Sequence, residues 1–80
     1  MHMTRPPCKS LIVIHNKYRS RPEKEVSIRF GQYFCNRYIK KFDSVTDTIF
    51  NMGFEKATNA INEWLYDNEY EYNTPPFNDE

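Results

Sequence analysis

The sequence has little glycine and little cysteine. Two glycines in 80 residues argue against a glycine-rich phosphate loop, because such a loop needs several glycines close together. The two cysteines, Cys8 and Cys35, are too few for the disulfide framework of a small secreted domain. We therefore expect two reduced thiols, and a bridge between them stays open only if the strands that carry them are neighbours.

Long apolar runs are missing as well. The longest, Leu11–Ile14, has four residues, whereas a membrane-spanning helix needs about 20. The sequence shows no basic and then apolar signal peptide, and Met1-His2 before Met3 is typical of a cloning remnant. We therefore expect no membrane partner and a cytoplasmic location, which is the host-cell cytoplasm if the chain is viral.

A chain of 80 residues forms one small domain. Its fold buries only about 60% of the surface that the unfolded chain exposes, which leaves little room for a substrate cleft. Six Phe, six Tyr and one Trp partly offset the small size, because each ring buries a large area. We expect a non-enzymatic domain over residues 10–66, a flexible lead over 1–9 and an acidic aromatic tail over 67–80.

What the chain has in quantity is charge, and the two signs are separated along the sequence. Residues 1–41 hold ten Lys and Arg against two Glu, whereas residues 42–80 hold nine Asp and Glu against Lys56. A surface of one sign attracts partners of the other sign. The sequence therefore predicts two candidate contact surfaces, one basic and one acidic.

Three strands are predicted in the basic half. Residues 10–17 contain the Leu-Ile-Val-Ile run, which suits a strand covered on both faces, and residues 25–30 alternate apolar and polar side chains. Gly31 fits the first central position of a two-residue hairpin after Phe30. This hairpin leads into a third strand over residues 33–42, and the three strands form an antiparallel meander.

The third strand has a competing interpretation as a helix. Its aromatic residues recur every four positions, which is helical spacing: Phe30, Phe34, Tyr38 and Phe42. The glycine and the aromatic enrichment favour the strand. In the hairpin register, one sheet face then carries Phe34 and Tyr38 beside Arg29 and Lys40.

The C-terminal half predicts helix. Asp43-Ser44 supplies an N-cap, and Ser44 and Asp47 have capping-box spacing. Apolar residues then recur every three or four positions, which is the spacing of one helix face. Either one long helix runs over 45–66, or Gly53 joins two shorter helices. The fold class is thus α+β, a three-stranded meander packed on these helices, with a mostly disordered acidic tail. The expected core holds Val26, Ile28, Phe30, Ile49, Phe50, Phe54, Ile61, Trp64 and Leu65.

The meander followed by a helix, with the step Phe42-Asp43-Ser44 between them, is similar in topology to plant AP2 domains and integrase arm-binding domains. That likeness covers residues 10–66 and implies DNA readout by the sheet, although the glycine-rich turns of those domains are absent. In size, aromatic content and charge separation, the chain also resembles small phage-encoded inhibitors of host defence proteins.

Catalytic and metal sites have little support in the sequence. His15 and Cys35 could pair as base and thiolate if the first and third strands adjoin, but no third orienting group is evident. Cys8, His15 and Cys35 lack the close spacing of a zinc site. We therefore expect no catalytic residue, no metal and no cofactor.

Two binding functions remain. The leading hypothesis is a protein-binding module, an inhibitor or adaptor that acts on a charged, nucleic-acid-handling protein. Its contact residues are acidic and aromatic: Glu63, Asp67, Glu69, Tyr70, Glu71 and Tyr72. The alternative is a nucleic-acid-binding domain, whose rings stack on bases and whose cations contact phosphates: Arg19, Arg21, Arg29, Phe34, Tyr38 and Lys40. A homodimer also stays open.

Overall fold

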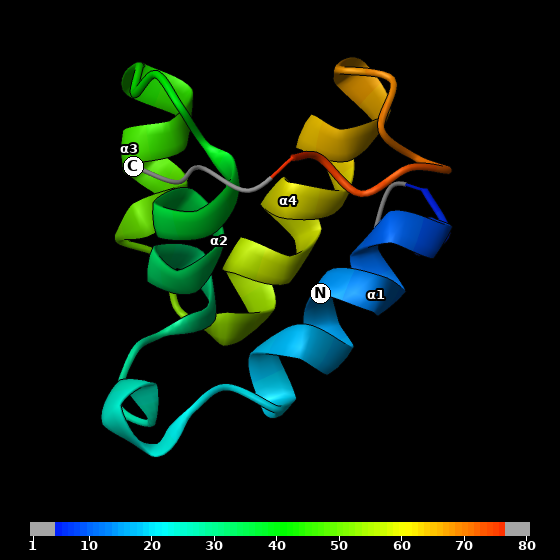
Figure 1. Cartoon of the computed structure of the whole chain (residues 1–80). Coiled ribbons are helices and arrows are strands. Elements are labelled where there is room, and N and C mark those ends of the chain that lie inside the picture. Colours follow the sequence, from blue (N-terminus) through cyan, green and yellow to red (C-terminus); the bar gives the residue numbers. More distant parts are fainter. Residues whose placement is uncertain (1–4, 77–80) are drawn as a thin grey trace.

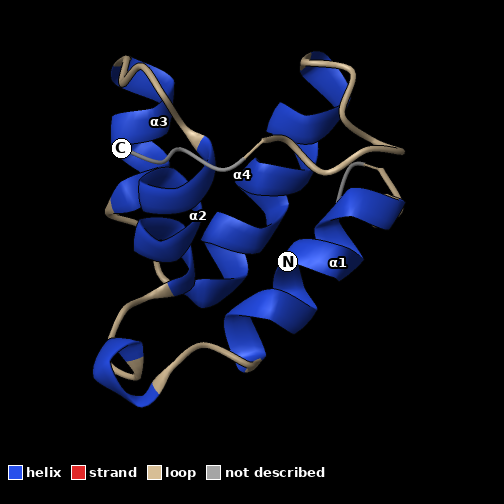
Figure 2. Cartoon of the chain, in the orientation of Figure 1, coloured by secondary structure: helices blue, strands red, loops and turns tan. Residues whose placement is uncertain are grey.

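The computed structural model describes residues 5–76, and all regular secondary structure in this part of the chain is helical (Figures 1 and 2). Its elements are α1 (Lys9–Arg19), the short 3-10 helix η1 (Glu23–Glu25), α2 (Phe30–Tyr38), α3 (Ser44–Phe50) and α4 (Phe54–Asp67). No strand occurs within the described residues. The predicted three-stranded meander is therefore wrong, and the topological likeness to sheet-based DNA-binding domains no longer applies.

The longest helix, α4, is central to the arrangement. It contacts α1, α2 and α3, while α2 also packs on α3. Figure 1 shows α2 and α3 on one side of α4 and α1 on the other, with successive long helices running in alternating directions. No helix in residues 5–76 is long and apolar enough to span a membrane.

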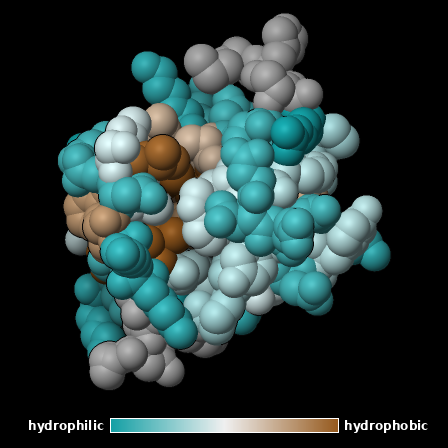
Figure 3. Space-filling view, turned by 90° about the horizontal axis from the view of Figure 1, so that it is seen from above, coloured by the Kyte–Doolittle hydropathy of each residue, from teal (hydrophilic) through white to brown (hydrophobic). Residues whose placement is uncertain are grey.

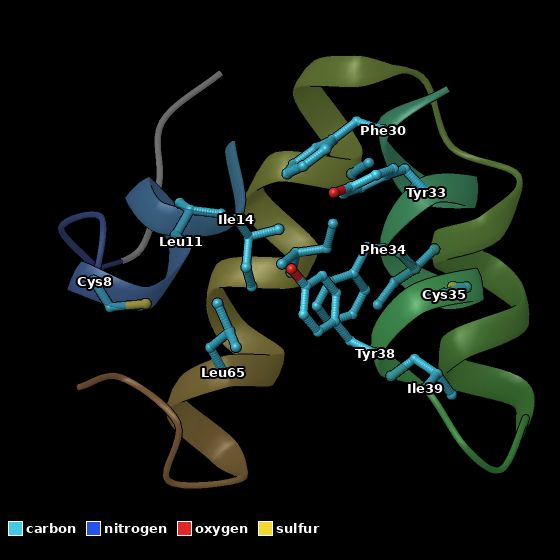
Figure 4. Packing of buried hydrophobic residues seen from close by; sticks show 13 residues of the cluster. Cys8, Leu11, Ile14, Phe30, Tyr33, Phe34, Cys35, Tyr38, Ile39 and Leu65 are labelled. Carbon is cyan, nitrogen blue, oxygen red and sulfur yellow. The ribbon is translucent and has the colours of Figure 1, made fainter. Parts of the chain in front are cut away.

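The buried core collects apolar side chains from all four helices (Figure 4). In α1, Leu11 and Ile14 are buried, whereas Ile12 and Val13 are 53% and 40% exposed. A helix turns about 100° per residue, so only two residues of a four-residue apolar run can face α4. The run that predicted a strand covered on both faces therefore belongs to a helix with one buried face.

The competing helical interpretation of the aromatic repeat is correct for α2. Phe30, Phe34 and Tyr38 lie on one face of α2 and are at most 4% exposed. Phe42, the fourth ring of the repeat, lies beyond the helix and is 49% exposed. The strand over 33–42 and its exposed aromatic face are thus replaced by a helix whose rings form the core.

Gly31 has a different role from the predicted hairpin. It lies in the first turn of α2, where a Cβ atom would stand 2.2 Å from the Ile49 carbonyl oxygen of α3. Any side chain would collide with backbone there. Gly31 therefore permits the close approach of α2 and α3 rather than a turn between strands.

The predicted start of the C-terminal helical region is confirmed, with a different capping partner. The Asp43 carboxylate accepts a hydrogen bond from the Thr46 amide at 3.0 Å, and the Thr46 hydroxyl accepts one from the Asp43 amide at 2.8 Å. The box thus pairs Asp43 with Thr46 rather than Ser44 with Asp47. Gly53 immediately precedes α4, so the interpretation as two helices is the correct one.

The predicted core is correct in part. Phe30, Ile49, Ile61 and Leu65 are fully buried, and Ile28, Phe50 and Trp64 pack against the core at its edge. Val26 and Phe54 are 63% and 49% exposed. The alternation over residues 25–30 predicts a buried Val26, but Val26 lies in the turn that directly follows η1.

Candidate functional site

The residues predicted to bind a protein lie on the last turns of α4 and on the segment that follows it. We call residues 68–76 the strap, because they fold back over the helices instead of leaving them (Figure 1). Of the acidic residues concerned, Glu63 and Asp67 are on α4, and Glu69 and Glu71 are on the strap. We call these four carboxylates the acidic surface, although Glu71 is only partly exposed and its Oε1 atom is buried without a hydrogen-bond partner among the described residues.

The strap turns back through a helix-ending motif. The amide of Tyr70 donates to the Leu65 carbonyl at 2.7 Å, and the amide of Glu69 donates to the Tyr66 carbonyl at 3.2 Å. Glu69 takes the left-handed conformation that this Schellman motif requires, with φ of 64°. Glycine is the usual residue at this position, so the sequence carries no signal for the turn.

Beyond the turn, the strap is attached to both α4 and α1. The Tyr70 ring stacks on Trp64 with centroids 5.7 Å apart. Ser10 in α1 donates its hydroxyl to the Tyr70 carbonyl and its amide to the Glu71 carbonyl, the latter at 3.3 Å. Residues 68–76 of the predicted disordered tail are therefore ordered against the helices, and residues 77–80 lie outside the described residues.

Arg5 partly balances the acidic surface. Its guanidinium lies 3.7 Å from the Glu63 carboxylate and 3.8 Å from that of Asp67, and it covers the Tyr66 ring at 4.8 Å. These ion pairs are exposed to solvent, and exposed pairs contribute only about 0–1 kcal/mol. A cation from a partner could therefore replace Arg5 at little cost.

The hydroxyl of Tyr66 is in an environment that disfavours its ionisation. It donates to the Pro6 carbonyl at 2.9 Å. Burial raises the pKa of Tyr66, the electrostatic influence of Cys8, Tyr72 and Glu71 raises it further, and the charge of Arg5 lowers it. Tyr72, farther along the strap, is 75% exposed.

The described part of the predicted lead is held by a residue that sequence reasoning did not single out. Asn62 of α4 is 1% exposed. Its side-chain oxygen accepts from the Cys8 amide at 3.0 Å, and its nitrogen donates to the carbonyls of Arg5 and Pro6 at 3.3 and 3.2 Å. The sequence signal that could have indicated this role is the position of Asn62, a polar residue next to Ile61 of the apolar stripe. Residues 1–4 of the lead lie outside the described residues.

The residues predicted to bind nucleic acid are not brought together. Phe34 and Tyr38 are in the core, and Arg29 and Lys40 lie beyond opposite ends of α2. Arg19 is exposed at the end of α1. The two rings therefore do not form the exposed stacking platform that a predicted sheet face would have offered.

Arg21, the remaining predicted cation of this set, is part of the fold. It donates to the carbonyls of Tyr18, Glu25 and Val26 at 2.6–2.8 Å, and its guanidinium lies 4.0 Å over the Tyr18 ring. These bonds organise the connection between α1 and α2. The guanidinium of Arg21 thus takes the place of water at three carbonyls. Its N–H donors point into the connection between α1 and α2.

The residues considered for catalysis are also separated. The Cys35 thiol is fully buried and donates to the Thr46 carbonyl at 3.3 Å, and burial raises its pKa to about 12. His15 packs against the Phe30 and Phe54 rings, with centroid distances of 4.9 and 5.0 Å. Cys8 and Cys35 are unbridged, and no metal-binding group of three His, Cys, Asp or Glu occurs within residues 5–76.

A hollow lies beside the acidic surface at the same end of the molecule. It is about 340 Å³ in volume and lies between the α2–α3 connection, α4 and the strap. Figure 3 views this end of the molecule from above, with hydrophobic residues gathered on the α2–α3 side.

Comparisons with protein families, with curated proteins and with solved structures found no match.

Proposed function

We propose that the chain is a small protein-binding module, an inhibitor or adaptor, that docks through its acidic surface on a basic surface of a partner. The observation that supports this proposal is the ordered strap. Its backbone hydrogen bonds fix Glu69 just beyond Asp67 of α4 and attach Glu71 to Ser10 of α1. An interface that is already ordered loses less conformational entropy on binding than a free tail does.

The chemistry of the acidic surface indicates the kind of partner. Tyr72 offers a largely exposed ring, and tyrosine is enriched among the residues that dominate protein interfaces. The carboxylates of the acidic surface add to the negative end of the α4 dipole. Basic surfaces of this complementary kind are common on proteins that handle nucleic acid, so such a protein is the partner that we propose.

The test compares capture of partners by the full-length chain with capture by a neutralised variant. The triple variant Asp67→Asn, Glu69→Gln and Glu71→Gln removes three negative charges from the acidic surface. A matched control, Glu23→Gln, Asp47→Asn and Glu55→Gln, removes three exposed charges elsewhere. Each chain is immobilised, incubated with lysate of the source cells at low salt, and washed with increasing salt.

We expect one protein to be retained by the native chain and by the control, and to bind the triple variant about tenfold or more weakly. This corresponds to somewhat less than 1 kcal/mol for each lost charge pair. A double-stranded oligonucleotide should displace the partner, because both compete for its basic surface. Equal retention by all three chains, or no retention at low salt, would contradict the proposal.

A direct titration distinguishes the alternative function, nucleic-acid binding by the chain itself, from this proposal. Labelled single- and double-stranded oligonucleotides are added to the full-length chain without any partner at 50 mM salt. We expect no binding, because the rings proposed for stacking are buried. Binding that falls steeply with salt would favour a nucleic-acid-binding function instead.

A further inference from the structure

The hollow beside the acidic surface has a wall of aromatic rings. Trp64 and Tyr70 line it and stack on each other with an angle of 8° between their planes. Trp64 also meets the Phe34 ring edge-on at 5.3 Å, which fixes its position from the core side. Tyr38 and Ile39 contribute to the lining from the end of α2.

The size of the hollow fits a single side chain of a partner with its flanking backbone. Its volume of about 340 Å³ is at the lower end of the range of about 300–1,000 Å³ for ligand pockets. The rings are held by the strap turn and the core, so the wall exists before anything binds. The aromatic wall suits an apolar or aromatic group.

The rim of the hollow carries a net positive charge. Lys40 and Lys41 line it and are exposed, and no hydrogen bond or ion pair joins their side chains to another residue in the range 5–76. Asp43, the carboxylate at this rim, already accepts from the Thr46 amide. Two cations are therefore available for carboxylates of a ligand.

We propose that this hollow is a second docking site, which binds a short segment of a partner protein with an aromatic side chain flanked by carboxylates. The ring of that side chain enters the hollow against Trp64, and the carboxylates pair with Lys40 and Lys41. This site is opposite in charge to the acidic surface. It goes beyond the function proposed above and does not depend on it.

Trp64 supplies the readout, because the chain has a single tryptophan and this residue lines the hollow. Its emission is followed while the full-length chain is titrated with the acetylated, amidated tripeptide Glu-Phe-Glu. The matched probes are Lys-Phe-Lys, which reverses the charge, and Glu-Ala-Glu, which removes the ring. We expect a saturable change with Glu-Phe-Glu and at least tenfold weaker binding of the other two.

Two substitutions locate the binding. The double variant Lys40→Gln and Lys41→Gln should weaken Glu-Phe-Glu binding about tenfold, as two lost charge pairs of somewhat under 1 kcal/mol each would do. The control Lys56→Gln, in the first turn of α4, should leave binding unchanged. Equal effects of the two variants, or no saturable change with Glu-Phe-Glu, would overturn the proposal.

The chain itself contains a segment of the proposed chemistry, since Phe77, Asp79 and Glu80 follow Pro76, which lines the hollow. The full-length variant Phe77→Ser tests this occupant. Glu-Phe-Glu should bind the native chain and this variant with similar affinity if the site serves a partner. Binding that is seen only with Phe77→Ser would overturn the proposal and assign the hollow to the chain's own segment.

Discussion

The two sides of α4 are held by different kinds of contact. On one side, α2 and α3 approach so closely that Gly31 leaves no room for a Cβ atom next to the Ile49 carbonyl. On the other side, α1 and the residues before it are attached through hydrogen bonds of Asn62 and Ser10. The first side includes a close backbone contact, whereas the second combines the buried Leu11 and Ile14 with hydrogen bonds of buried polar groups.

This difference determines which substitutions each side tolerates. A close backbone contact fails when atoms are added, since a packed core resists even one extra methyl group. A buried hydrogen bond fails when a partner is removed, because the remaining donor stays unsatisfied away from water. The strap depends on the second side, since Ser10 carries two of its hydrogen bonds.

The largest effect is expected from Gly31→Ala, which tests the side with the close backbone contact. The added methyl would stand 2.2 Å from the Ile49 oxygen, so α2 and α3 must separate. We expect the free energy of unfolding in urea to fall by about 3 kcal/mol, despite the better helix propensity of alanine. The control Gly53→Ala meets no atom within 4 Å and should change stability by about 1 kcal/mol or less. Similar losses for both variants would contradict the contact.

Asn62→Ala tests the buried hydrogen bonds of the other side. It leaves the Cys8 amide and the carbonyls of Arg5 and Pro6 without the Asn62 side chain. We expect a loss of about 2 kcal/mol in the free energy of unfolding, with faster hydrogen exchange at the Cys8 amide. Asn59→Ala, on the same helix and less deeply buried, is the control. An unchanged exchange rate at Cys8 would show that Asn62 does not hold this segment.

Glu69→Gly should stabilise the strap turn. Glu69 has a φ of 64°, a conformation that costs a residue with a side chain about 1 kcal/mol and glycine almost nothing. We expect the free energy of unfolding to rise by about that amount. Glu69→Gln removes the charge but keeps the strained conformation, so it should recover only a small part of the gain. If both variants gain equally, charge rather than backbone conformation explains the effect.

The smallest effect is expected from pH, through His15 of α1, whose ring packs against Phe54 of α4. Burial lowers the pKa of His15, and the nearby Arg19 lowers it further. The folded state then binds fewer protons than the unfolded state, so stability should decrease as the pH falls through about 6.5 and level off below the folded-state pKa. The difference in urea midpoint between pH 7.5 and 5.5 should shrink in His15→Gln. If the native chain and His15→Gln show the same difference in urea midpoint, His15 is not the origin of the pH dependence.

The sequence predicted the C-terminal half of the fold better than the first half. The apolar stripe over α3 and α4 has helical period and is interrupted by Gly53 between them, and Asp43 supplies a side-chain cap. In α1, the β-branched Ile12, Val13 and Ile14 favour a strand locally. In α2, the four-residue spacing was the correct signal, and Gly31 was misleading because a glycine in a turn and one in a helix contact have the same local signature.

The candidate site was predictable in composition but not in arrangement. The sequence identified the acidic and aromatic residues of the last segment, and the structure gathers them at one end of α4. The strap turn was not predictable, because a glutamate stands where glycine is usual. The hollow was also hidden, since Lys40, Trp64 and Tyr70 belong to three different segments.

By itself, the sequence determined the separation of charge, the absence of any long apolar run and the helical period of the C-terminal half, because these are properties of neighbouring residues. Only the tertiary structure decided that Phe34 and Tyr38 are core, that Arg21 binds carbonyls and that the strap lies against α1 and α4. The burial of the two rings and the position of the strap depend on contacts between distant segments, whereas the Arg21 bonds depend on the path of the backbone between α1 and α2. Contacts between distant segments outweigh local preferences that amount to about 1 kcal/mol per residue or less.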